Sequence, residues 1–248
     1  MIILKSENEI NYISNSCKTA AEVLEKLKSC IRPGISTGEI NQLSESLILE
    51  KGCKSAFLGY RGYPANICTS VNEEVVHGIP SRRILKNGDI IKLDVGVVKD
   101  GYFGDLAATV PVGFISDDAK KLVRVTEEAL YVGILKANTE NRLGDISAGI
   151  QVFVEKNGYS VVRILTGHGI GRALHEEPEV PNYGKEGSGV RLKNGMVFCI
   201  EPMVNAGTYE VETKEDKWTV ITKDRKLSGH FEHTVAIINN KAEILTKI

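Results

Sequence analysis

Two aspartates on neighbouring β-rich segments are the residues of this 248-residue sequence best placed for chemistry. Asp94 and Asp105 flank Asp100-Gly101, a dipeptide that favours a tight two-residue hairpin turn. With that turn Gly96 lies opposite Asp105, so the alternation of side chains makes the two aspartates diagonal neighbours on one face. Adjacent carboxylates repel each other and are costly to bury unpaired. The pattern predicts a cation between them, although solvation of both aspartates on an exposed face fits the hairpin equally well.

Three further potential metal ligands lie at the ends of apolar segments elsewhere in the chain. Glu201 ends an apolar strand-like run, Glu232 begins another, and His168 lies between glycines in the stretch 166–171. With the two aspartates they form an oxygen-rich set with one imidazole, which suits a pair of divalent cations bridged by carboxylates and water. Taken singly, each is better explained as a core polar residue with a hydrogen-bond partner.

Helical and strand-like patterns around these residues predict an α+β protein. Capping residues and apolar spacing predict helices over 6–31, 36–52, 116–137 and 144–156. Besides the hairpin over 90–111, β-rich runs predict strands over 67–71, 159–165, 195–201, 217–222 and 227–238. The order helix, helix, strands occurs twice, which favours a pseudo-symmetric fold whose strands merge into one sheet with helices on one side. We find no linker that would separate a second domain.

Composition and charge argue against several classes of protein. Lys+Arg 31 against Asp+Glu 32 gives no signal for nucleic acid or an anionic membrane. No apolar run approaches the roughly eighteen residues of a spanning helix, and the apolar start before Lys5 is too short for the core of a signal peptide. The five cysteines form no CxxC pair and are interpreted as reduced thiols. We expect a soluble, cytoplasmic protein.

The ligand candidates lie in motifs that resemble those of the type I methionine aminopeptidases, peptidases of the pita-bread fold. The shared motifs extend over essentially the whole chain: Asp94-x10-Asp105, Gly167-His168-Gly169-Ile170-Gly171, His175-Glu176-Glu177-Pro178, Glu201-Pro202-Met203, Lys223-Asp224-Arg225 and Phe231-Glu232-His233-Thr234. The resemblance implies one metallo-aminopeptidase catalytic domain over residues 1–248. It also implies a pseudo-two-fold fold with a central antiparallel sheet and helices on one side.

The resemblance implies a dinuclear metal-dependent hydrolase. Such an enzyme removes the N-terminal methionine from nascent proteins and peptides when the second residue is small, using a metal-bridged water. By resemblance Asp94 binds the first metal, Asp105 and Glu232 bridge both, and His168 and Glu201 bind the second. Oxygen ligands with one histidine admit Co, Mn, Fe or Zn.

The resemblance also implies catalytic and substrate-binding roles. Glu201 would shuttle a proton, His175 would donate to the tetrahedral oxyanion, and His77 would orient the scissile nitrogen or the developing charge. His230 and His233 match no such role and are expected to be structural or solvated. The methionine side chain would contact mostly apolar or soft groups, namely Phe57, Tyr60, Tyr63, Cys68, Leu174 and Trp218. Three positions depart from the residues frequent in bacterial members and bear on the shape of this pocket: Leu174, Arg61 and Phe57.

Two alternatives compete with this interpretation. A prolidase or aminopeptidase P would carry a long extra N-terminal domain, whereas the first capped helix here begins at Ser6. A non-catalytic pita-bread binding module would have lost ligand positions, and all five are present. The family resemblance further implies a monomer with transient ribosome association, with no direct nucleic-acid motif and no membrane partner.

Overall fold

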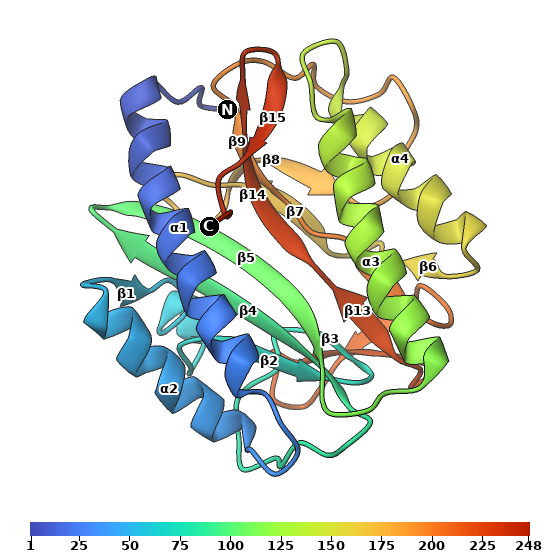
Figure 1. Ribbon diagram of the computed structural model, residues 1–248. Helices are drawn as coiled ribbons and strands as arrows, with labels where there is room; N and C mark the ends of the chain where they lie inside the picture. The colour runs from blue at the N-terminus through green and yellow to red at the C-terminus, as the bar shows by residue number, and fades with distance from the viewer.

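Four helices cover one side of a large antiparallel sheet in the computed structural model, which describes residues 1–248 (Figure 1). The helices are α1 (Glu7–Cys30), α2 (Thr37–Glu50), α3 (Asp117–Lys136) and α4 (Leu143–Lys156), with one 3₁₀ turn, η1 (Tyr60–Gly62). The predicted α+β class with helices on one side is confirmed. None of these helices combines the length and the apolar character needed to cross a bilayer.

Fifteen strands form three sheets. The largest contains β1 (Lys54–Ser55), β2 (Cys68–Val71), β4 (Ile90–Lys99), β5 (Tyr102–Pro111), β7 (Thr166–Gly169), β8 (Glu176–Pro181), β9 (Val197–Ile200), β14 (Glu232–Ile238) and β15 (Lys241–Ile244). The two smaller sheets contain β3 (Glu74–Val76), β6 (Ser160–Val161), β10 (Met203–Asn205), β11 (Val211–Thr213), β12 (Val220–Thr222) and β13 (Ser228–His230). The main sheet has the order β1-β4-β5-β14-β9-β7-β8, and the small ones β13-β10-β6 and β11-β12-β3.

The prediction that all strands merge into one sheet is wrong, because two small sheets form beside the main one. The expected strand 227–238 is divided, with β13 in a small sheet and β14 in the main sheet. The expected strand 159–165 is interrupted: β6 pairs with β10 in a small sheet, the chain bends at 163–164, and β7 then joins the main sheet. His168 consequently lies inside a strand rather than after one. The strand expected over 217–222 begins only at Val220, so Trp218 lies in the turn before it.

The helices are positioned by caps and by a core on one face of the hairpin. Ser6 and Glu9 form a capping box at the start of α1, an arrangement typically worth about 1 kcal/mol because it satisfies free backbone N–H groups. α1 packs directly on β5 at Gly104, where a Cβ would lie 2.4 Å from the backbone nitrogen of Cys17. The apolar face of the hairpin lies in the main core, with Leu93 and the other residues of that face: Ile91, Val95, Val97, Leu106 and Val110. The opposite face, which carries the aspartates, is left for the site.

Candidate active site

The hairpin formed by β4 and β5 has the register that the sequence predicts. Asp94 pairs with Ala107 across the Asp100-Gly101 turn, and Glu232 of β14 pairs with the same Ala107 from the other side. Both turn residues have positive φ, 51° and 76°, as a primed turn requires. Asp94, Asp105 and Glu232 therefore project from the same face of three adjacent strands.

The three carboxylates converge closely enough to share a cation. One oxygen from each of Asp94, Asp105 and Glu232 lies within 4.8 Å of the others. The side chains of Asp105 and Glu232 are only 4% and 3% exposed. One buried oxygen of each of the three residues, Oδ1 of the two aspartates and Oε1 of Glu232, has no hydrogen-bond donor. Buried carboxylate oxygens of this kind are normally satisfied, and a hard divalent cation is a partner that suits all three at once.

His168 and Glu201 complete the set from β7 and from the end of β9. The His168 Nε2 atom lies 3.7 Å from Oε1 of Glu201 and 4.0 Å from Oδ2 of Asp105. Its Nδ1 atom lies 3.0 Å from the Gly169 carbonyl. With Nδ1–H donating to that carbonyl, the lone pair of Nε2 points toward the carboxylates, which is the tautomer that a metal ligand needs.

The electrostatics of the cluster favour binding of a cation. Burial raises the pKa of Asp105 to about 7. Burial first, and then repulsion by neighbouring carboxylates, raises the pKa values of Asp94, Glu201 and Glu232 well above the usual range. Burial also lowers the pKa of His168 to about 4, so its imidazole is neutral at pH 7. A bound cation would replace protons on these carboxyl groups and relieve their repulsion.

The two histidines predicted to contact substrate lie beside this cluster. The ring centroids of His175 and His168 are 4.1 Å apart, and Nδ1 of His175 lies 2.8 Å from the Tyr60 hydroxyl. Burial lowers the pKa of His175 to about 3. His77 has a φ of 59°, and its ring centroid lies 6.5 Å from that of Trp218 in an edge-on arrangement. A non-glycine residue in this left-handed region is uncommon and is held there by its surroundings.

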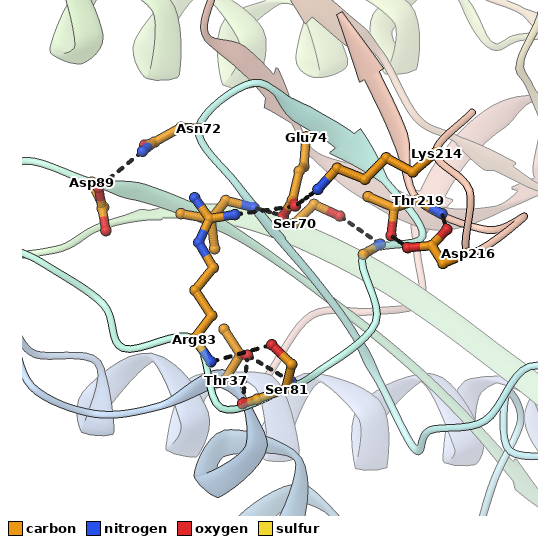
Figure 2. Close-up of polar contacts among 12 residues, drawn as sticks. Thr37, Ser70, Asn72, Glu74, Ser81, Arg83, Asp89, Lys214, Asp216 and Thr219 are labelled. Carbon is orange, nitrogen blue, oxygen red and sulfur yellow. Dashed lines mark hydrogen bonds and ion pairs between the residues drawn. The ribbon is translucent and has the colours of Figure 1, made fainter. Parts of the chain in front are cut away.

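A polar network joins the start of β3, which precedes His77, to the segment before Trp218, and Figure 2 shows its side chains. Glu74, at the start of β3, is buried and lies between two cations. Its Oε1 atom accepts from Lys214 Nζ at 2.5 Å and lies 3.1 Å from Nη1 of Arg83. Lys214 belongs to the turn that leads to Trp218, while Glu74 lies three residues before His77. Thus one buried carboxylate joins both segments.

A cavity of about 140 Å³ brings all the predicted site residues together. Its lining comprises the five candidate ligands and eight predicted substrate-contacting residues, plus Arg61: Phe57, Tyr60, Arg61, Tyr63, Cys68, His77, Asp94, Asp105, His168, Leu174, His175, Glu201, Trp218 and Glu232. Arg61 was noted in the sequence only as a departure from the family pattern. Its guanidinium carbon lies 5.4 Å from the centroid of the Tyr60 ring, so a cation borders the aromatic wall.

His230, which was expected to be structural or solvated, lies buried next to Glu201. It is buried rather than solvated, with 1% exposure, and its Nε2 atom lies 3.5 Å from Oε2 of Glu201. The available signal was its position two residues before Glu232, since alternating side chains share a face. His233 takes the structural role that was expected, with Nδ1 2.8 Å from the Thr246 hydroxyl.

A larger cavity of about 300 Å³ lies away from this chemistry. It is lined by residues of α1, α3 and the chain end and includes His233. None of the five candidate ligands borders it. Size alone therefore does not locate the site; the convergence of carboxylates does.

Comparisons with known proteins point to one family of enzymes. Residues 11–239 match metallopeptidase family M24. The chain is 52% identical to a methionine aminopeptidase of Clostridium perfringens over 248 residues, which is 100% of both chains. It resembles the crystal structure of the methionine aminopeptidase from Rickettsia prowazekii with a TM-score of 0.98 and 42% identity over 100% of both chains. The prolidase from Pyrococcus furiosus shares the fold, with a TM-score of 0.80 and 22% identity, and 66% of that chain is covered.

Proposed function

The chain belongs to metallopeptidase family M24, and from that premise we propose that its carboxylate cluster holds two divalent metal ions at the site of methionine removal. The activity is metal-dependent hydrolysis that releases the N-terminal methionine of a polypeptide. The observation that carries the proposal is the convergence of carboxylate oxygens from Asp94, Asp105 and Glu232 within 4.8 Å, each residue with a buried oxygen that lacks a donor.

The family resemblance supports a division of the ligands between the two ions. Asp94 would serve the first ion, His168 and Glu201 the second, and Asp105 and Glu232 both. Oxygen donors with one imidazole accept Co, Mn, Fe or Zn. When bound, such ions lower the pKa of a water molecule and polarise the scissile carbonyl.

Glu201 is the proposed proton shuttle. Its carboxylate lies between His168 and His230, 3.7 Å and 3.5 Å from their Nε2 atoms. Burial and the neighbouring Asp105 raise its pKa well above the usual range in the metal-free protein. Once a bound cation has displaced its proton, the carboxylate would be a base that can accept a proton from the attacking water. It would then return that proton to the leaving amine.

His175 is the proposed donor to the oxyanion. The Tyr60 hydroxyl can donate to Nδ1 of His175 at 2.8 Å, which leaves the proton of the neutral ring on Nε2. Since burial lowers the pKa of this imidazole to about 3, it remains neutral and can donate a hydrogen bond without carrying charge into the site. His77 would orient the scissile nitrogen.

The rest of the cavity supports selection of a methionine with a small second residue. Tyr63 and Trp218 meet edge to face with their ring centroids 5.1 Å apart, beside the thiol of Cys68. Soft and aromatic surfaces of this kind suit a thioether. By the family resemblance, a large β-branched second residue would collide with the wall of the cavity and hold the scissile carbonyl away from the carboxylates.

We also propose that residues 1–248 act as one catalytic domain, monomeric and cytoplasmic, on nascent chains with transient ribosome association. Support for one domain comes from the match to the Clostridium perfringens relative over 100% of both chains. The remaining assignments rest on the family resemblance and on the near-neutral net charge of −1.

The experiment that tests the proposal is hydrolysis of a Met-Gly-x peptide by protein whose metal content is measured by elemental analysis. Activity should disappear with a chelator and return with Co, Mn, Fe or Zn, with two ions per chain at saturation. An Ala-Pro dipeptide, a substrate suited to a proline-directed enzyme, should not be cleaved. Undiminished turnover in metal-free protein would refute the proposed site, and preferential cleavage of the proline substrate would refute the selectivity.

A further inference from the structure

The segment that carries His175 has no helix or strand of its own. It runs between β7 and β8, and Glu176, the first residue of β8, folds it into a loop. Oε1 of Glu176 accepts from the backbone N–H groups of Arg172 at 2.8 Å and Ala173 at 3.1 Å. The carbonyl of Gly171 is held by the Phe103 N–H at 2.9 Å. The Glu176 carboxylate therefore closes the loop 171–176, and Phe103 anchors its start.

The other oxygen of this carboxylate is bound by a lysine from the far end of the sequence. Lys5 Nζ donates to Oε2 of Glu176 at 2.5 Å, and the two side chains are 3% and 13% exposed. The backbone N–H of Lys5 donates to the Gly195 carbonyl at 2.7 Å, which fixes the segment before α1 against the turn before β9. A Cβ added at Gly171 would lie 2.7 Å from Lys5 Nζ, so the ammonium packs directly against the loop.

We propose that Lys5 is a positioning residue for the loop 171–176. Its buried ammonium holds Glu176, and through Glu176 it sets the position of His175 beside His168, where the ring centroids are 4.1 Å apart. The proposal rests on the oxyanion role proposed above for His175. Without the ammonium, Glu176 is a largely buried carboxylate with no cation partner, and such a group moves toward solvent when it can. The loop and His175 move with it.

The effect of Lys5 is expected on turnover and not on metal binding. The recorded polar contacts of Lys5 go to Gly195 and Glu176, and none goes to a candidate metal ligand. His175 has a second restraint in its 2.8 Å contact with the Tyr60 hydroxyl, so loss of Lys5 should displace the ring without freeing it. A displacement of about 1 Å at a group that acts in catalysis can cost about a hundredfold in rate.

The test compares Lys5→Met, which keeps the length of the side chain without its charge, with Lys5→Arg, which keeps the charge. Lys5→Met should lower kcat on a Met-Ala peptide by roughly tenfold or more, with KM changed far less. The stoichiometry and affinity of Mn²⁺ binding, measured by calorimetry, should stay at the wild-type values. Lys5→Arg should retain most of the turnover. Lys18→Met, on the exposed surface of α1, is the control and should change nothing.

A double-mutant cycle with His175→Ala separates positioning from general stability. If Lys5 acts through His175, Lys5→Met should cost nothing further in the His175→Ala protein. Equal losses in both backgrounds would overturn the proposal, and so would wild-type turnover of Lys5→Met. If His175→Ala itself has wild-type kcat, the oxyanion role of His175 is wrong, whatever Lys5 does.

Amide hydrogen exchange measures the order of the loop 171–176 independently of catalysis. The N–H groups of Arg172 and Ala173 should exchange faster in Lys5→Met, because Glu176 no longer accepts from them, while amides of β4 keep their protection. If Lys5→Met does not fold, Glu176→Ala provides the test instead, since it removes the oxygens that accept from the ammonium and from the two loop N–H groups. Unchanged exchange in the loop of a folded variant would contradict the assignment.

Discussion

Replacing Asp105 by asparagine tests two effects of the buried carboxylate: it lowers the stability of the metal-free protein, and it allows the site to bind metal. Burial raises the pKa of Asp105 from 3.8 to about 7. The folded protein therefore holds a proton that the unfolded chain has already released, and stability falls as the pH rises across that interval. Asparagine has nearly the same shape and no charge to desolvate. We expect Asp105→Asn to stabilise the metal-free protein at pH 7 and to abolish its response to metal.

The magnitude follows from the pKa. A rise from 3.8 to about 7 corresponds to about 4 kcal/mol at roughly 1.4 kcal/mol per pH unit. Any group of the buried asparagine amide that lacks a partner costs about 1–3 kcal/mol, which offsets part of the gain. A net gain of about 1–3 kcal/mol should raise the Tm of a chain of this size by roughly 2–10 °C.

Calorimetric melting in a chelator measures the stability of the metal-free protein, and melting in Mn²⁺ measures how much the metal stabilises it. Wild-type protein should gain stability from Mn²⁺, whereas Asp105→Asn should start higher, gain little and hydrolyse a Met-Ala peptide near background. Asp100→Asn removes the same charge from the exposed turn of the same hairpin and should behave as wild type. The reasoning is refuted if metal-free Asp105→Asn melts below wild type or if Mn²⁺ stabilises it as strongly.

Three further outcomes follow from the site. His175→Ala should keep both ions by elemental analysis and lose about a hundredfold or more in kcat; departure of the metals together with the activity would make His175 a ligand instead. Mn²⁺ should raise the Tm more at pH 7 than at pH 5, because protons occupy the raised-pKa carboxyl groups of Asp105 and Glu232 in acid; a shift independent of pH would contradict the burial argument. A Met-Ala peptide should be cleaved far faster than a Met-Ile one, and because the chain begins Met1-Ile2, intact mass spectrometry of active protein should find Met1 retained; its wholesale loss would refute the proposed steric limit.

The carboxylates of the site could be predicted from the sequence because the patterns that indicate them are local. The Asp100-Gly101 turn fixes the register of ten residue pairs, which is enough to place Asp94 and Asp105 on one face. Glu201 and Glu232 are recognisable because a carboxylate at the end of an apolar strand is unusual. The residues involved in each inference are at most about twenty positions apart in the chain. The prediction that these segments meet at one site, however, rested on the family resemblance and not on the local patterns.

The features that the sequence did not predict have two origins: partners far away in the chain, and a local turn contact that interrupts a strand-like pattern. The alternation over 159–165 is the same whether a strand continues or passes from one sheet to another, so the bend at 163–164 leaves no local mark. Trp218 reads as part of a strand, yet Asp216 caps its backbone N–H at 2.9 Å and keeps it in a turn. Lys5 and Glu176 are 171 positions apart, and no sequence pattern near either residue predicts that they form an ion pair.

The residues proposed to bind metal and the residues proposed to contact substrate are held in place by different parts of the fold. The carboxylates of Asp94, Asp105 and Glu232 lie on adjacent strands of one sheet, where backbone hydrogen bonds fix their positions whether or not a substrate is bound. The two histidines proposed to contact substrate, His77 and His175, lie outside the strands, and each has an ion pair near it in the chain. Buried Glu74, three residues before His77, pairs with the half-buried cations of Arg83 and Lys214. Glu176, next to His175, pairs with the buried Lys5. A buried ion pair adds little net stability, but removal of one partner leaves a charge without compensation. Substitutions in these pairs should therefore alter turnover and peptide preference before they alter metal content, whereas substitutions in the strands should do the reverse.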